Sequence, residues 1–134
     1  MSMILVAYDG SSVANKALEH SISIAEPNDE ILILMVIPKA DSFFYSEDSN
    51  EISFEDAKIN LEALTKKYEH TGLKLTTEVL QGDIVKEILN ASNRPNCKLI
   101  VMGYKGVSKI GRFKLGSVSG RVAKLAKKPV LIVK

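Results

Sequence analysis

Residues 3–12 read Met3-Ile-Leu-Val-Ala-Tyr8-Asp9-Gly10-Ser11-Ser12, and this stretch decides the fold class. The run from Met3 to Tyr8 does not alternate apolar and polar residues, which is typical of a strand covered on both faces and hence of a parallel sheet. The Asp-Gly-Ser-Ser that follows is typical of a turn into a helix, because Asp and Ser side chains accept hydrogen bonds from the N–H groups at a helix start. A covered strand that passes directly into a helix indicates an α/β protein.

The same succession of strand and helix continues along the chain. Short apolar runs predict five strands, at Met3–Tyr8, Ile31–Ile37, Leu73–Leu80, Cys97–Met102 and Val130–Val133. Only the run at 73–80 alternates more, as an outer strand does. Apolar residues spaced by three and four predict four helices, with stripes running from Val13 to Ala25, Phe54 to Tyr68, Ile84 to Leu89 and Val118 to Ala126.

This order of elements predicts the architecture. Crossovers between parallel strands are right-handed, so a doubly wound sheet accommodates strands and helices that strictly take turns. A length of 134 residues fits one domain. We therefore predict a single-domain, doubly wound (Rossmann-like) α/β fold over residues 1–134. Its five-stranded parallel sheet has the order 3-2-1-4-5, with strands numbered along the chain, and helices cover both faces.

One connection, at residues 38–53, is unusually long. It carries three aromatic residues, Phe43, Phe44 and Tyr45, beside acidic residues such as Glu47 and Asp48. A loop of this length is typical either of a lid or partner-binding segment or of plain disorder. Both interpretations stay open.

Composition excludes several classes of protein. Apolar residues make up 46% and charged residues 25%, which is typical of a globular rather than a disordered chain. The longest apolar runs fall far below the roughly 20 residues of a membrane span, and no basic segment precedes the first strand as in a signal peptide. A single cysteine, Cys97, forms no internal disulfide. We expect a cytoplasmic protein that does not insert into membranes.

Charge is divided unevenly along the chain although the formal net charge is only +2. Residues 1–87 hold seven basic and sixteen acidic residues, a sum of −9, whereas residues 88–134 hold eleven basic and no acidic ones, a sum of +11. A block of this kind suits nucleic acid or acidic proteins. Nucleic-acid recognition motifs are absent, and the acidic remainder repels a polyanion. A solvated helix face at Lys124, Lys127 and Lys128 is therefore favoured over a nucleic-acid surface.

The segment after the fourth predicted strand points to a phosphate ligand. It reads Gly103-Tyr104-Lys105-Gly106, then nine residues, then Gly116-Ser117 and a helix. Glycines let backbone N–H groups approach an anion, and a helix start adds further donors. Four cations lie inside the segment: Lys105, Lys109, Arg112 and Lys114. Ligands of doubly wound sheets bind where the winding reverses, which places this segment opposite Asp9.

Standard nucleotide motifs do not occur here. The stretch Gly106–Gly111 has the spacing of a phosphate-binding P-loop, but Arg112 and Phe113 stand where Lys and Ser or Thr are required. No Gly-x-Gly-x-x-Gly follows the first strand. The chain is thus neither a P-loop enzyme nor a typical dinucleotide-binding protein.

The glycine pattern resembles the universal stress protein family, whose ATP-binding members carry Gly-x2-Gly-x9-Gly-Ser/Thr after the fourth strand. The likeness spans the chain and includes Asp9, Val36, the Gly82-Asp83 turn and the closing Pro129–Val133. It implies ATP, with Mg²⁺ or Mn²⁺, as the ligand. By position, the implied nucleotide-binding residues are Ala7, Asp9, Val36, Met102, Gly103, Gly106, Gly116, Ser117 and Val118.

The resemblance also implies separate roles within this set. Asp9 contacts the adenosine part, Val36 packs near the base, and the Gly and Ser residues hold the phosphates. Met35 departs from the family pattern, since many members have His there, which affects only details of the pocket. Taken alone, Asp9 is better explained as the cap of a turn. Opposite the glycine segment at the point where the winding reverses, the ligand role is favoured.

Three functions are weighed for this chain. The first is an ATP-binding stress-response regulator with little or no turnover, because acidic residues that hold a metal for hydrolysis are missing from the basic segment. The second is an interaction protein that binds no nucleotide and uses the basic face for acidic partners or RNA. The third, a slow ATPase, is the weakest. The apolar last strand, Val130, Leu131, Ile132 and Val133, further predicts a homodimer.

Overall fold

The computed structural model of the chain describes residues 1–39, 53–104 and 115–134. These residues form five strands, β1 (Met3–Ala7), β2 (Glu30–Ile37), β3 (Lys74–Gln81), β4 (Cys97–Gly103) and β5 (Val130–Val133). They also form four α-helices, α1 (Ser12–Ile24), α2 (Phe54–Lys67), α3 (Ile84–Ser92) and α4 (Leu115–Leu125), and a short 3-10 turn, η1 (Glu69–Thr71). Every predicted strand and helix is present. The connection at 38–53 lies almost entirely outside the described residues.

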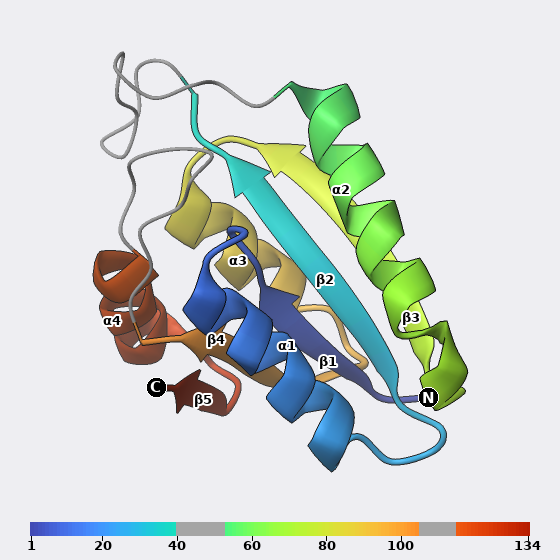
Figure 1. The fold of residues 1–134 in the computed structure, drawn as a ribbon. Coiled ribbons are helices and arrows are strands. Elements are labelled where there is room, and N and C mark those ends of the chain that lie inside the picture. Colours follow the sequence, from blue (N-terminus) through green and yellow to red (C-terminus); the bar gives the residue numbers. More distant parts are fainter. Residues whose placement is uncertain (40–52, 105–114) are drawn as a thin grey trace.

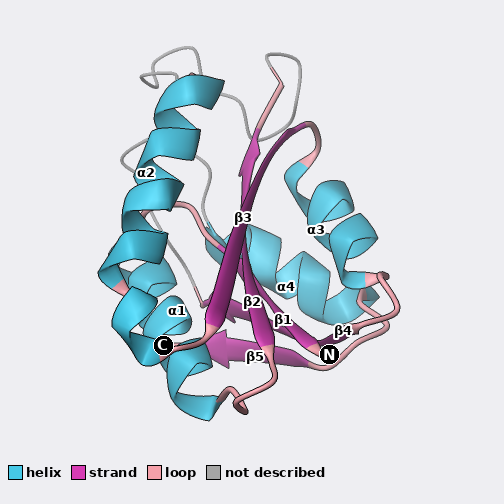
Figure 2. Cartoon of the chain, turned by 90° about the vertical axis from the view of Figure 1, so that its right-hand side faces the viewer, coloured by secondary structure: helices cyan, strands magenta, loops and turns pink. Residues whose placement is uncertain are grey.

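The sheet has the predicted topology. All four strand pairs are parallel, and the order is β3-β2-β1-β4-β5. Helices α1 and α2 cover one face of the sheet and α3 and α4 the other, as Figures 1 and 2 show. The predicted doubly wound architecture with strand order 3-2-1-4-5 is confirmed. No helix among the residues with described placement is long and apolar enough to cross a membrane.

Two apolar layers, one on each face, form the core. Successive side chains of a strand point to opposite faces, so one uninterrupted apolar run supplies both layers. In β1, for example, Leu5 packs on the α3 and α4 side, whereas Val6 packs on the α1 and α2 side. Strand β3 contributes no buried residue. Its alternating sequence therefore belongs to an edge strand, as predicted.

Helix α1 lies so close to the end of β4 that only glycine fits there. A Cβ atom added to Gly103 would lie 2.8 Å from Cγ2 of Val13 and 2.9 Å from its Cβ. Carbon atoms in van der Waals contact lie about 3.5–4 Å apart. The sequence analysis assigns Gly103 to phosphate binding. In the structure, a glycine is required here because α1 packs closely against the end of β4.

Part of the basic C-terminal third holds the opposite, amino-terminal edge of the sheet together. The Lys98 Nζ lies 2.6 Å from the Oδ2 of buried Asp29, and Arg94 forms two hydrogen bonds with the Glu78 carboxylate on β3. The Nζ of Lys128 donates to the carbonyl oxygens of Cys97 (2.6 Å) and Arg94 (3.2 Å). Lys128 is therefore a structural residue, and its assignment to a solvated helix face is wrong.

We predict that Gly103→Ala destabilises the fold by about 1–3 kcal/mol, because the new methyl group overpacks the contact with Val13. The matched control is Gly120→Ala in α4, where an added Cβ meets nothing within 4 Å. That substitution is expected to stabilise by about 0.5–1 kcal/mol through helix propensity. Urea denaturation measures both changes. The effect of Gly103→Ala should shrink in a Val13→Ala background, and an equal cost in both backgrounds would contradict the packing explanation.

A second prediction concerns acid stability. The hydrogen bond from Lys98 lowers the pKa of Asp29 in the folded chain. The pair therefore stabilises the fold at pH values above the pKa that this carboxyl has in the unfolded chain. That contribution is lost as the pH falls through the lower folded-state pKa. Lys98→Met should reduce the melting temperature at pH 7 and flatten its decline below about pH 4. Lys124→Met on α4 serves as the control. If the melting temperatures of wild type and Lys98→Met fall by the same amount between pH 7 and pH 3, the Lys98–Asp29 pair does not have this role.

Candidate functional site

A small hollow lies where β1 and β2 end, at the edge to which the carboxyl ends of the parallel strands point. It is lined by residues from β1, from β2 and from the first two turns of α3: Ala7, Tyr8, Asp9, Leu34, Val36, Ile84 and Ile88. The fold therefore brings Ala7, Asp9 and Val36 together, although Val36 is distant from the other two in sequence. The floor and walls are apolar, and Asp9 is the only acidic residue among the described residues of the lining.

The turn between β1 and α1 holds Asp9 in place. Gly10 adopts a φ of 83°, in the left-handed region that favours glycine. The Asp9 Oδ1 accepts a hydrogen bond from the Ser11 N–H (2.9 Å), and the Ser11 Oγ accepts one from the Ala14 N–H (3.2 Å) at the start of α1. Ser11 thus caps the helix, while Asp9 holds Ser11. The turn role considered for Asp9 is observed, and it fixes a side chain that is 2% exposed beside the hollow.

The end of β4 and the start of α4 complete this edge. Met102 and Val118 are fully buried in the same core cluster as Ala7 and Val36, but neither of them lines the hollow. Helix α4 begins at Leu115, before Gly116 and Ser117 and not after them as predicted. Both residues lie in its first turn, and Ser117 is exposed.

Part of the predicted phosphate segment cannot be placed against this geometry. Gly106 and the cations Lys105, Lys109, Arg112 and Lys114 lie outside the described residues. The described flank, Tyr104, connects three elements: its N–H donates to the Val133 carbonyl (2.8 Å), and its carbonyl oxygen accepts from the Ser119 hydroxyl (3.1 Å). Tyr104 is 39% exposed.

Sequence reasoning missed Ile84 and Ile88 as lining residues. The two isoleucines are one helical turn apart on α3, and both are 2% exposed. Their apolar stripe was visible in the sequence, but only as a core stripe. The Gly82-Asp83 turn is the sequence feature that indicates their position, because α3 begins directly after it at the edge where β1 and β2 end.

The electrostatics of this edge suit an anion. Helices α1, α3 and α4 all begin here (Figure 1), and helix starts carry partial positive charge and N–H donors. Burial, together with the nearby Asp9 charge, raises the pKa of the Tyr8 hydroxyl, which donates to the Asn15 Oδ1 (2.6 Å). No group of three or more His, Cys, Asp or Glu side chains suited to a metal occurs within residues 1–39, 53–104 and 115–134.

Relatives of known name cover nearly the whole chain. Universal stress protein YxiE of Bacillus subtilis is 35% identical over 145 residues, a match that covers 98% of this chain and 97% of that protein. Universal stress protein MJ0531 of Methanocaldococcus jannaschii is 34% identical over 137 residues, with coverage of 98% and 81%.

Solved structures share the fold. The structure of MJ0577 from the same archaeon aligns with a TM-score of 0.78 and 26% identity, and covers 99% of this chain and 95% of that one. A universal stress protein in complex with cAMP aligns at 0.72 and 22% identity, with coverage of 99% and 97%. An Arabidopsis thaliana protein of the family, with AMP bound, aligns at 0.64 and 22% identity, with coverage of 100% and 91%.

The model of the universal stress protein family matches residues 1–134. Together with relatives above 30% identity over almost the entire chain, this match shows that the protein belongs to the universal stress protein family.

Proposed function

We propose that the protein binds an adenine nucleotide, and ATP in particular, at the edge where β1, β2 and β4 end. One observation carries the proposal: the fold brings buried Asp9 together with the apolar side chains of Ala7 and Val36 in one hollow. An adenine ring is flat and largely apolar with polar atoms on its rim, so an apolar floor beside a fixed carboxylate suits an adenosine group. In this proposal the ring lies over the hollow, and Asp9 accepts from its polar groups.

The phosphates then extend toward the start of α4. Gly116 and Ser117 lie in its first turn, where backbone N–H groups are available to an anion. Gly106 and the four cations of residues 105–114 would complete the contacts. The chain has no acidic residue after Glu87, so nothing in this half repels a triphosphate. This charge distribution favours ATP over AMP or cAMP, which are bound in two structures of the same fold.

We further propose that binding serves regulation in a stress response, with little or no turnover, and that the protein acts in the cytoplasm. Phosphoanhydride hydrolysis usually needs a metal held by carboxylates and a residue that positions water. Among the residues that the structure describes, Asp9 alone supplies a carboxylate to the hollow. A Mg²⁺ or Mn²⁺ ion at this site would therefore depend mainly on the phosphate oxygens of ATP for its ligands.

The last strand is proposed to pair with a second copy of the chain. The carbonyl oxygens of Pro129 and Val133 accept from the N–H groups of Ile100 and Tyr104 on β4. Because backbone groups of alternate residues point to opposite sides of a strand, those of Val130 and Ile132 point away from β4. All four residues of β5 are half-buried and apolar, and an exposed apolar edge normally pairs.

The nucleotide proposal predicts a shift in thermal stability. Millimolar ATP with Mg²⁺ should raise the melting temperature by several degrees, since a ligand at about 100 times its Kd stabilises by about 2.7 kcal/mol. Asp9→Asn keeps the size of the side chain and an oxygen for the Ser11 N–H, so it should fold but lose most of the shift. Asp56→Asn, on the exposed first turn of α2, is the matched control.

Two further measurements separate the parts of this proposal. Gly106→Val should abolish the shift with ATP while reducing that with AMP less, because it affects only the phosphate segment. Denatured fresh protein should release adenine nucleotide, identified by mass. No released nucleotide together with no thermal shift for any adenylate would contradict the proposal, and phosphate release above background with Mg²⁺ or Mn²⁺ would contradict the absence of turnover.

The dimer proposal predicts a change in mass. At low micromolar concentration, sedimentation should return twice the chain mass of 14.7 kDa. Ile132→Pro removes an outward N–H without removing a bond to β4, and Pro is tolerated in edge strands. This variant should be a monomer that still unfolds cooperatively, while Ile132→Val should remain a dimer. A monomeric wild type would refute pairing through β5.

A further inference from the structure

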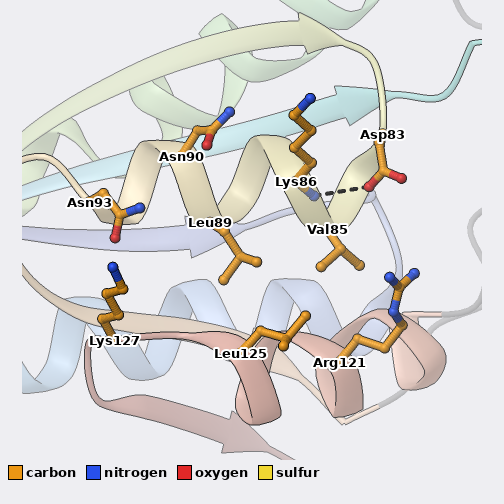
Figure 3. Close-up of a pocket in the computed structure, with 9 residues that line it drawn as sticks. All are labelled: Asp83, Val85, Lys86, Leu89, Asn90, Asn93, Arg121, Leu125 and Lys127. Carbon is orange, nitrogen blue, oxygen red and sulfur yellow. Dashed lines mark hydrogen bonds between the residues drawn. The ribbon is translucent and has the colours of Figure 1, made fainter.

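A second recess lies between α3 and α4, and it is lined by other residues of α3 than those that line the hollow. Its volume is about 370 Å³, and Figure 3 shows its lining: Asp83, Val85, Lys86, Leu89, Asn90, Asn93, Arg121, Leu125 and Lys127. Ile84 and Ile88 of α3 line the hollow, whereas Val85 and Leu89 line this recess. We call it the α3–α4 groove.

The groove has an apolar floor that is incompletely covered. Val85 is 2% exposed and Leu89 is half-buried, so both belong to the packed surface between the helices. Leu125 at the end of α4 is 52% exposed. Figure 3 shows the Leu89 and Leu125 side chains on facing sides of the groove. When a partner covers a leucine that is exposed beside other apolar side chains, apolar surface leaves water and the free energy falls.

Cations without acidic partners surround this floor. Lys86, Arg121 and Lys127 are all exposed, and within the described ranges none of them lies within 4.0 Å of a carboxylate. Asp83, the only acidic residue in the described part of the lining, accepts from the Lys86 N–H (2.9 Å) as the cap of α3. The groove therefore presents an excess of positive charge that a negatively charged ligand neutralises.

Two amides add a further kind of contact. Asn90 and Asn93 lie along α3 at the side of the groove (Figure 3), and both are exposed. A side-chain amide donates and accepts, so it matches the N–H and C=O groups of a peptide backbone. The groove thus combines an apolar floor, a cationic rim and amides. These features are complementary to an acidic peptide that also carries apolar side chains.

We propose that the α3–α4 groove binds a short acidic, amphipathic peptide segment of a partner protein. An apolar side chain of the segment covers Leu89 and Leu125, and flanking Asp or Glu residues pair with Lys86, Arg121 and Lys127. Single-stranded RNA fits the groove less well, because its bases stack on aromatic side chains, and the described residues that line the groove include none. The inference goes beyond nucleotide binding, since it concerns a different face of α3.

A displayed library of random 12-residue peptides provides the test. Selection on the wild-type protein, with counter-selection on Arg121→Glu, should enrich peptides that combine Asp and Glu with Leu, Ile or Phe. The most enriched peptide is then synthesised and its binding measured by fluorescence anisotropy at about 150 mM salt. A 20-nucleotide single-stranded RNA is titrated in parallel.

Matched variants on one helix then locate the site. Arg121→Glu should weaken peptide binding at least tenfold, whereas Lys124→Glu, the same charge change on α4 outside the lining, should weaken it less than threefold. Leu125→Ser should weaken binding about fivefold without changing charge. Melting temperatures confirm that each variant is folded.

Several outcomes would overturn the proposal. These are a selection without enrichment of acidic and apolar residues, equal losses for Arg121→Glu and Lys124→Glu, or an unchanged affinity of Leu125→Ser. Tighter binding of RNA than of the selected peptide would replace it with a nucleic-acid surface.

Discussion

The complete burial of β1 is the constraint on which the rest of the structure depends. All five of its residues are buried, with β2 on one side and β4 on the other. Right-handed crossovers first run outward from β1 through β2 to β3, and after the chain returns past β1 to β4 they run outward to β5. Because the direction reverses, α1 and α2 lie on one face of the sheet and α3 and α4 on the other. The reversal leaves the carboxyl end of β1 uncovered by a crossover, and Asp9 occupies that place. The position of the hollow thus follows from the burial of one apolar strand at the centre of the sheet.

The basic C-terminal third serves more than one purpose. Lys98, Arg94 and Lys128 hold the amino-terminal edge through a buried carboxylate, an edge strand and two backbone carbonyls. Arg121 and Lys127 instead border the α3–α4 groove without acidic partners among the described residues. The cations that give residues 88–134 a net charge of +11 therefore do not form one continuous surface. Its structural members stabilise the sheet, whereas Arg121 and Lys127 belong to a different surface.

Helix α3 separates the two candidate binding regions. Ile84 and Ile88 face the hollow, and Val85 and Leu89, each the next residue along, face the groove. A nine-residue helix packed on both sides moves as a unit, because close-packed side chains resist independent displacement. The ligands proposed for the hollow and for the groove would therefore both contact this one helix.

The sequence by itself determined the strands, the helices, their order and the strand at the sheet edge, because these follow from periodicity and turn residues within short segments. The resemblance to the universal stress protein family added Ala7 and Val36 to Asp9, and the fold brings these three residues together. Tertiary structure alone decided that Gly103 accommodates Val13, that Lys128 bonds to distant carbonyls and that Ile84 and Ile88 line the hollow. It alone also revealed the groove. Each of these depends on distances between segments far apart in the chain, and no local pattern of residues encodes such distances.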